Sequence, residues 1–515
     1  MFKFIINLTQ KLIIFIFIKI SFTKRKKLNL KNINFKQIDF INYKKIKQYV
    51  FKENFFYDKN FIDSHSFEFL FYLQKIGGKS GIEISKKNIF LWFNLFKNKL
   101  EFPWDEKLTA QRLLSIYYNY EFVSSVLSKT ENTLLNKIIN IHIKRLFFFF
   151  KRKNLDEISS YEIVAFILSK LLLKEFNQGF LKKIEKIIEI QIDRAGMHKS
   201  YNVLEQAKFI NNLNEVKNIL LFFKIVVPEK INFFILNMTS ALNQYIHQDG
   251  TVALFNGANN NYQKQIQDII EKEEFLKSRT FTNNNGIAFY SDKKRSLFFD
   301  VVQPNNLKVS KSLGAGTLSF ELSIKDEKII TNCGASESYG KNPEYLRYSA
   351  AHSTIILKNT NISEIKAGNP HIKYPQKVSF QKNDFEKIID FEGSHNGYLR
   401  KFKKIIKRKI IIEKNEDKIH GEDSIISLKS TNSKTVYHIR FHLMPDITTN
   451  ITTNKKNIIL KTKKNKIWMF KSNSELGLEK SIYVDNNSTK ETQQIVIKGI
   501  TDSTKKIEKW SIEAI

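Results

Sequence analysis

Arg440 and His442 have a spacing that suggests binding chemistry. They alternate with Phe441 in residues 435–443, which have the β-branched and aromatic composition of a strand, so both side chains lie on one face of it. An arginine on such a face can bind a carboxylate through two parallel hydrogen bonds. The alternative is that this face meets solvent or that both side chains make structural hydrogen bonds.

His395 is a second candidate for substrate contact. It lies in the sequence Ser-His-Asn-Gly-Tyr, which predicts a turn between strands, where polar residues often recognise ligands. Alternatively, it only shapes the turn. Glu422 and Asp423 are a poor acid–base pair, because adjacent strand residues point to opposite faces. The sequence has no Walker loop, dinucleotide fingerprint, zinc-finger spacing or nucleophile elbow.

Length and charge limit the class of protein. The 515 residues suffice for two or three domains, and 42% of them are hydrophobic. The formal net charge of +33 indicates a polyanion partner, or else the lysine-rich composition that an AT-rich genome favours. Because the charge is spread along the chain, we expect no nucleic-acid binding. The single cysteine, Cys333, excludes an intrachain disulfide.

Residues 1–57 form a basic N-terminal segment with an apolar run at 12–18 (LIIFIFI). The run is too short to span a membrane, so we expect no transmembrane span. It resembles the core of an export or anchor signal, but no small-residue cleavage site follows it. The alternative is an ordinary N-terminal helix.

The elements that carry these residues change type along the chain. In residues 58–282 apolar side chains recur at helical spacing, which predicts an array of helices. In residues 283–515 short β-branched and aromatic runs alternate with turns, which predicts an antiparallel β-sandwich. The predicted strands are 286–290, 296–302, 317–324, 328–332, 353–357, 404–413, 418–426, 435–443, 457–461, 466–470 and 494–498.

Several sequence blocks resemble the heparinase II/III-like family, especially its alphaproteobacterial branch. In the β half they are 317–334 (TLSFELSIKDEKIITNCG), 348–355 (YSAAHSTI), 393–398 (GSHNGY), 421–423 (GED), 440–445 (RFHLMP) and 494–499 (QIVIKG). In the helical half they are 65–70 (HSFEFL), Trp104, 112–114 (RLL) and 249–257 (DGTVALFNG). The order of the blocks is more specific than any one of them.

The resemblance implies an α+β multidomain protein, with an N-terminal (α/α) toroid followed by a C-terminal antiparallel β-sandwich. It also implies an acidic, uronate-containing polysaccharide as the partner. Lyases of the family cut such glycans by β-elimination, in which the uronate carboxylate is neutralised, a base removes the C5 proton and an acid protonates the leaving oxygen.

The family's zinc motif is degraded in this sequence. Ser312 and Gly314 stand where the family has two histidines, and Asn332 stands where it has a ligating aspartate. Only His352 remains, and one histidine does not hold zinc. We therefore expect no zinc or other cofactor. His352 is either a substrate-binding residue or a buried structural histidine.

The resemblance also implies roles for residues of the helical half. His198 and Asn202, in the loop 196–202 (GMHKSYN), are candidates for neutralising the uronate carboxylate, with Asn202 as a helix cap the alternative. Tyr262 is the candidate acid and base, the alternative being a solvent-facing side chain in an asparagine-rich loop. Tyr245 competes with it, although its helical context favours core packing.

Two functional hypotheses follow from the resemblance. The first is a polysaccharide lyase-like protein that acts on an acidic glycan in the periplasm or cell envelope, with the cytoplasm as the alternative location. The second is a non-catalytic glycan-binding or envelope-biogenesis protein that kept the fold and lost the metal site. The sequence leaves the sugar, the linkage and the oligomeric state open.

Overall fold

The computed structural model describes residues 40–272, 286–305, 307–336, 344–366, 372–428, 434–485, 488–501 and 504–515. The chain divides into two compact units, Met1–Ile190 with Lys208–Ile235, and Gln191–Ala207 with Leu236–Ile515. The apolar run at 12–18 and the predicted boundary at 283 lie outside the described residues. Within those residues, no helix combines the length and hydropathy that crossing a membrane requires.

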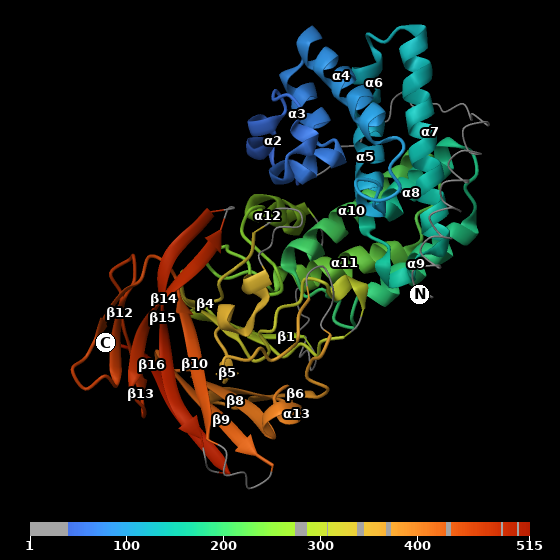
Figure 1. The fold of residues 1–515 in the computed structure, drawn as a ribbon. Helices are drawn as coiled ribbons and strands as arrows, with labels where there is room; N and C mark the ends of the chain where they lie inside the picture. The colour runs from blue at the N-terminus through green and yellow to red at the C-terminus, as the bar shows by residue number, and fades with distance from the viewer. Residues whose placement is uncertain are drawn as a thin grey trace, which may run out of the picture. The chain divides into compact units, whose positions relative to one another are not determined.

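Before the strands begin, the described residues fold mainly into helices (Figure 1). α9, α10 and α11 each have residues in both units. The helices are α2 (Tyr43–Tyr49), α3 (Phe69–Ile76), α4 (Gly78–Phe96), α5 (Glu106–Tyr118), α6 (Tyr120–Ser124), α7 (Lys129–Arg152), α8 (Ser160–Leu172), α9 (Gln178–Gln191), α10 (Val203–Phe222), α11 (Glu229–Asn243) and α12 (Gln263–Lys272).

Local sequence explains where the longer helices begin. α7 starts with a capping box, in which the Ser128 side chain accepts from the backbone of Glu131 and the Glu131 side chain accepts from the backbone of Ser128. α8 repeats this arrangement with Ser159 and Glu162. Each box satisfies two backbone N–H groups that the first turn of a helix leaves without partners.

Arg112 organises the core of the first unit, where its side chain is fully buried. Its guanidinium donates to the Nε2 of His142 and the carbonyl of His65, and lies 3.9 Å from the ring centre of Trp92. Burial and Arg112 together lower the pKa of His65 to about 3. The neutral histidine can therefore accept a hydrogen bond from the Trp92 indole. The motif around residues 65–70 and Arg112 thus positions helices.

Two antiparallel sheets follow in the second unit (Figure 1). The first has the order β1-β2-β3-β4-β10-β15-β14, with β5 paired to β10, and comprises β1 (Ile287–Ser291), β2 (Arg295–Asp300), β3 (Phe320–Ile324), β4 (Glu327–Thr331), β5 (Ile355–Leu357), β10 (Thr435–Leu443), β14 (Leu476–Asp485) and β15 (Ser488–Thr501). The second has the order β11-β12-β13-β16-β9-β8-β7-β6 and comprises β6 (Val378–Asp384), β7 (Ile388–His395), β8 (Lys404–Glu413), β9 (Lys418–Ser427), β11 (Thr448–Ile451), β12 (Asn457–Lys461), β13 (Ile467–Ser472) and β16 (Lys505–Ala514).

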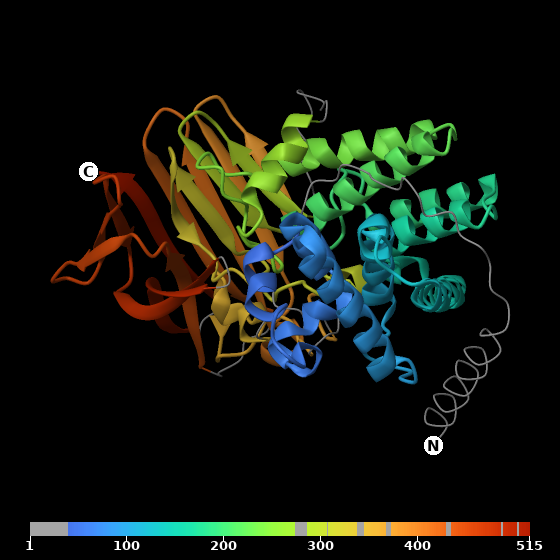
Figure 2. The same cartoon turned by 90° about the horizontal axis from the view of Figure 1, so that it is seen from above.

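The two sheets pack face to face around one apolar core (Figure 2). Phe320 and Phe441 of the first sheet meet Trp510 of the second, with ring centres 5.5 and 5.0 Å from it. Gly421 lies opposite Trp510 on β9, where a Cβ would come within 2.0 Å of the indole. Position 421 therefore needs glycine for its lack of a side chain. The predicted order, helices and then an antiparallel sandwich, is confirmed.

The strand predictions were incomplete. β8, β10 and β12 have the predicted bounds, and most of the others differ by a few residues. β6, β7, β11, β14 and β16 were not predicted. β6 and β14 lie at sheet edges and are largely half-exposed, so that lysines, glutamates and serines interrupt the apolar pattern that marks a strand.

Candidate functional site

Asn202 is the N-cap of α10. Its Oδ1 accepts from the backbone N–H groups of Leu204 and Glu205 at 2.9 and 3.2 Å. Its Nδ2 donates to the carbonyl of Asn256 at 3.1 Å. The residue is 5% exposed. The oxygen and the nitrogen of this amide are thus both bonded to the backbone. This is the helix-capping role that the sequence offered as the alternative to neutralising a carboxylate.

His198 is fixed by its own loop. Its Nδ1 accepts from the hydroxyl of Ser200 at 2.7 Å and faces the Ser200 backbone N–H at 3.3 Å. Because Nδ1 accepts, these hydrogen bonds assign the proton of the neutral ring to Nε2. The backbone N–H of His198 donates to the side chain of Gln206. In this arrangement the imidazole donates through Nε2, which suits a carboxylate acceptor.

Asn256 joins this loop to the β half. Its Nδ2 donates to the carbonyl of Tyr201, and its Oδ1 accepts from the backbone N–H of Gly314 at 3.0 Å. Gly314 in turn packs against His352, where an added Cβ would lie 2.7 Å from Nε2. We call Asn202, Asn256, Gly314 and His352 the amide junction. The structure therefore brings two predicted residues, Asn202 and His352, into one connected region.

The position of the family's zinc site does not fit a zinc ion. The Oδ1 of Asn332 accepts from the backbone N–H of Ser353 at 3.0 Å, and Gly314 offers no side-chain donor. One imidazole, that of His352, is far short of the four ligands of a structural zinc site. Over the described part of the chain, no cluster of three His, Cys, Asp or Glu side chains could hold a metal.

Tyr262 and Tyr245 are both buried. Tyr262 precedes α12 and is 6% exposed, so the alternative of a solvent-facing side chain is wrong. Tyr245 is a core residue, as its context indicated. Its hydroxyl donates to the carbonyl of Ile287 at 3.0 Å, and its ring packs against Phe298.

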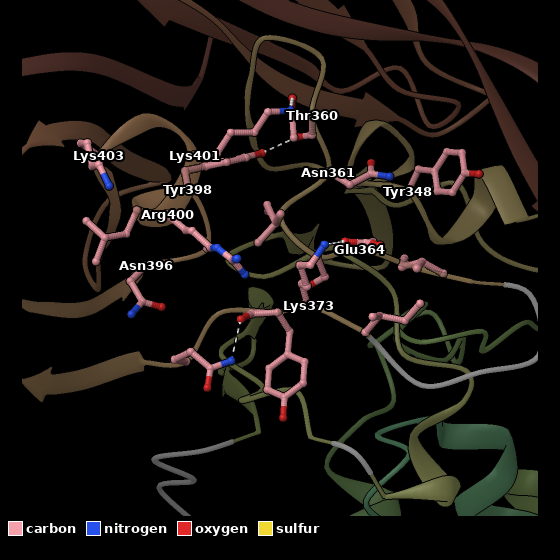
Figure 3. A pocket seen from close by; sticks show the side chains of 18 of the residues that line it. Tyr348, Thr360, Asn361, Glu364, Lys373, Asn396, Tyr398, Arg400, Lys401 and Lys403 are labelled. Atoms are coloured by element: carbon pink, nitrogen blue, oxygen red, sulfur yellow. Dashed lines mark hydrogen bonds and ion pairs between the residues drawn. The ribbon is translucent and has the colours of Figure 1, made fainter. Parts of the chain in front are cut away.

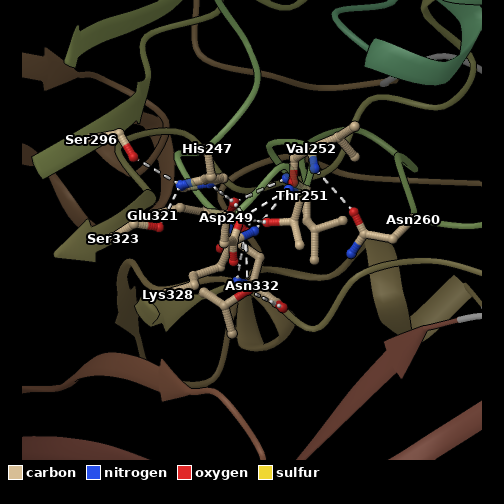
Figure 4. A network of polar contacts seen from close by, with 12 residues as sticks. His247, Asp249, Thr251, Val252, Asn260, Ser296, Glu321, Ser323, Lys328 and Asn332 are labelled. Atoms are coloured by element: carbon tan, nitrogen blue, oxygen red, sulfur yellow. Dashed lines mark hydrogen bonds and ion pairs between the residues drawn. The ribbon is translucent and has the colours of Figure 1, made fainter. Parts of the chain in front are cut away.

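Glu321 is the centre of a buried polar network (Figure 4). One of its carboxylate oxygens, Oε2, lies 3.0 Å from the Nε2 of His247 and 3.1 Å from the Nζ of Lys328, and accepts from the backbone of Leu254. The other, Oε1, accepts from the hydroxyl of Thr331. Burial alone would raise the pKa of Glu321, but Lys328 and the hydrogen bond from His247 lower it to about 2. The network anchors the chain near Leu254, just before Asn256, to β3 and β4.

The prediction that His395 lies in a turn is wrong. It is the last residue of β7, where the alternation of the strand turns its side chain inward, and it is 1% exposed. Its Nδ1 accepts from the backbone N–H of Gly397. Burial, with a smaller effect of Arg408, lowers its pKa to about 3. The ring is therefore neutral at physiological pH.

Arg440 and His442 share one face of β10, as predicted, and on that face both bond side chains of β14 or β15, which lie beside β10 in the same sheet. Arg440 donates to the side chains of Glu479 and Gln494, both at 3.0 Å. His442 is held by the hydroxyl of Ser481 and a backbone carbonyl. These are the structural hydrogen bonds that the sequence left as the alternative.

A cavity of about 330 Å³ beside His442 contains the thiol of Cys333. The sulfur lies 3.6 Å from the Nδ1 of His442. Burial raises the pKa of Cys333 to about 11 and lowers that of His442 to about 3. A thiol and an imidazole that are both neutral do not form a nucleophilic pair.

Comparison with known proteins decides the family of the β half. Residues 277–511 match the family described as heparinase II/III-like, C-terminal. The β half is a heparinase II/III-like domain. The resemblance of its ordered sequence blocks to that family is thereby confirmed. FtsZ-localized protein C of Caulobacter vibrioides is 23% identical over 288 residues, which are 53% of this chain and 50% of that protein. The chain thus spans about half the length of this relative.

Solved structures resemble the chain over almost its whole length. Heparinase III has a TM-score of 0.68 and 12% identity, with 97% of this chain and 88% of that chain covered. Heparan sulfate lyase HepC from Pedobacter heparinus has a TM-score of 0.59 and 13% identity, with 97% and 87% covered. At such identities the likeness shows the fold alone. It confirms the (α/α) toroid followed by the β-sandwich.

Sequence reasoning missed Glu321, Lys328, His247 and Asn256. One signal was present, since Glu321 stands between Phe320 and Leu322 in a mostly apolar strand that is buried on both faces. A carboxylate in such a strand must be paired with a cation, because an isolated buried charge is very costly. The partners His247 and Lys328 lie 74 and 7 residues away, so the sequence did not identify them.

Proposed function

We propose that this protein binds an acidic, uronate-containing polysaccharide with a lyase fold but does not cleave it by β-elimination, and that it uses no zinc. The observation that most directly supports the absence of cleavage is the bonding within the amide junction. Both ends of the Asn202 amide and both ends of the Asn256 amide are bonded to backbone groups. The likeness to heparinase III supports the choice of an acidic glycan, and the net charge of +33 agrees with it.

The chemistry of β-elimination explains why the junction matters. A uronate C5 proton becomes acidic only when the neighbouring carboxylate is neutralised by a donor that is aimed at it. Replacing the backbone bonds of Asn202 with a bond to substrate would remove the cap of α10 and the link to Asn256. A buried amide whose oxygen and nitrogen both bond backbone groups serves the fold, and in our proposal it stabilises no developing charge.

The test combines binding and turnover. The purified full chain is incubated with heparan sulfate, alginate, chondroitin and bacterial capsule polysaccharide, while the ultraviolet absorbance of unsaturated uronate is followed. Binding of at least one polysaccharide is measured in parallel by calorimetry. We expect binding without absorbance. Absorbance that grows with enzyme concentration and is abolished by Tyr262→Phe would overturn the proposal.

Catalysis is the second candidate function, and one observation favours it. The hydrogen bonds of His198 assign its proton to Nε2, the orientation in which the imidazole could donate to a uronate carboxylate. In that case His198 neutralises the carboxylate and Tyr262 acts as acid and base. The same absorbance assay decides between the two candidates, and His198→Gln should then lower the rate as strongly as Tyr262→Phe.

For location we propose the cell envelope or periplasm, where acidic polysaccharides occur. The cytoplasm is the alternative, and the printed name of the relative, FtsZ-localized protein C, supports it. A fluorescent fusion to the C-terminus, imaged together with labelled FtsZ, separates the two. Midcell signal that is lost after FtsZ depletion favours the cytoplasm, and release of the protein with the periplasmic fraction favours the envelope.

A further inference from the structure

A cavity of about 1240 Å³ lies in the heparinase-like domain, apart from the amide junction (Figure 3). Its walls are the segments 360–365 and 372–376, and the turn 396–403, which includes the short helix α13 (Leu399–Phe402) and joins β7 to β8. Small-molecule sites typically measure about 300–1,000 Å³. This pocket is therefore large enough for more than one sugar ring.

The walls of the pocket are fixed by the protein itself. The hydroxyl of Tyr398 donates to the carbonyl of Thr360 at 2.8 Å. A Cβ added to Gly397 would lie 2.9 Å from both the side chain and the carbonyl of Ile362. The Oδ1 of Asn396 accepts from the backbone N–H of Lys377, directly after the segment 372–376, at 3.0 Å. The turn 396–403 is thus held against the segment 360–365 before any ligand arrives, so binding would cost little ordering of the backbone.

The charge of the pocket is unbalanced. Glu364 is its only carboxylate among the described lining residues, and it pairs with Lys373 at 2.6 Å. Arg400, Lys401 and Lys403 also line the pocket. Within the described residues none of these three cations forms an ion pair. Lys401 makes one hydrogen bond, to the hydroxyl of Thr360 at 3.2 Å.

The arrangement of the cations suits an anionic sugar. In Figure 3 the guanidinium of Arg400 extends into the middle of the pocket, toward Lys373 and Glu364. A guanidinium can hold a carboxylate or sulfate through two parallel hydrogen bonds, and a lysine adds a point charge. Tyr348 and Tyr374 also line the pocket and supply ring surface for a sugar face.

We infer that this pocket is the binding site for an acidic oligosaccharide segment, with Arg400 and Lys401 holding its carboxylate or sulfate groups. The inference rests on the proposed function for the class of ligand. The inference goes beyond the proposed function by placing recognition in the turn between β7 and β8. The residues of this turn belong neither to the family's zinc motif nor to the amide junction.

The experiment compares two double variants of the full chain. Arg400→Gln with Lys401→Gln removes two positive charges from the pocket. Lys456→Gln with Lys463→Gln removes two from exposed positions outside it and is the matched control. Calorimetry measures the Kd of each protein for a heparan sulfate tetrasaccharide, for neutral cellotetraose and for single-stranded DNA. Thermal unfolding shows that each variant is folded.

We expect the pocket variant to bind the tetrasaccharide at least tenfold more weakly than wild type, with the control within twofold and cellotetraose unbound by all three. Wild-type affinity in the pocket variant would overturn the inference and leave the proposed function intact. Failure of the wild type to bind the tetrasaccharide or any polysaccharide of the panel would overturn both. DNA binding as tight as tetrasaccharide binding, and equally sensitive to the pocket variant, would overturn the assignment to a sugar.

Discussion

Two polar regions of the second unit differ in how their side chains are used. At the amide junction and around Glu321, polar side chains are buried and bonded to backbone groups or to one another. In the pocket between β7 and β8, Arg400, Lys401 and Lys403 stand in a basic wall without carboxylate partners among the described residues. The first region stabilises the fold. The second keeps its charges available, which is why we propose that recognition takes place there.

The largest effect should come from breaking the Glu321 network. Glu321→Gln leaves the ammonium of Lys328 buried without a counter-charge, and we expect the free energy of unfolding to fall by about 3–5 kcal/mol. Urea denaturation measures it. The matched control is Glu392→Gln, which removes a half-exposed partner of Lys407 and should cost less than about 1 kcal/mol. Equal losses would mean that burial does not distinguish the two regions.

The pH dependence of stability tests the buried histidines. The ordinary pKa of histidine is 6.5, and burial lowers that of His395 to about 3. Between these values the unfolded chain binds a proton that the folded chain excludes, so stability is full above pH 6.5 and falls as the pH drops toward 3. We expect about 1.4 kcal/mol per pH unit from His395 at most. In thermal unfolding between pH 7 and pH 4, the melting temperature of His395→Gln should fall less steeply than that of the wild type.

Asn202→Ala should lower the free energy of unfolding by about 0.5–2 kcal/mol, because the N-cap of α10 is lost. Asn202→Asp keeps the capping oxygen and should retain most of that stability. Neither variant should change tetrasaccharide affinity, since the side chain serves the backbone. A loss of affinity in Asn202→Asp, measured by calorimetry on a protein of unchanged melting temperature, would move recognition back to the junction.

The smallest effect is expected in the pocket. Arg400→Gln with Lys401→Gln should change the free energy of unfolding by no more than about 0.5 kcal/mol, because exposed charges without carboxylate partners contribute little to stability. Urea denaturation checks this. A loss above about 2 kcal/mol would show that these cations are structural, and the contrast between the two regions would disappear.

The sequence predicted the fold better than the use of its polar residues. The strands β10 and β12 could be found because apolar and β-branched residues dominate them. The charged, half-exposed β14 and β16 could not, because their pairing with neighbouring strands and not their composition makes them strands. Whether the Asn202 amide is available to bind a ligand depends on Asn256, which lies 54 residues away. The residues around Asn202 in the sequence therefore could not predict its role.

The pocket cations escaped notice for a different reason. The stretch 400–404 (RKFKK) does not stand out in a chain with 84 lysines and arginines. What separates Arg400 and Lys401 from the rest is a position on a concave wall combined with the absence of an ion pair among the described residues, and both are properties of the folded chain.

The close packing of His352 bears on how the protein can evolve. Any side chain at position 314 would begin 2.7 Å from the imidazole, and one at position 316 would begin 2.8 Å from it. A single mutation that returned a histidine to position 314 would collide with the one family ligand that remains. Regaining the metal site therefore requires at least two coordinated changes, the new histidine and a displacement of His352. The small residues at 314 and 316 thus fix which ligand sets this region can accept, because a larger residue at either position must displace His352 first.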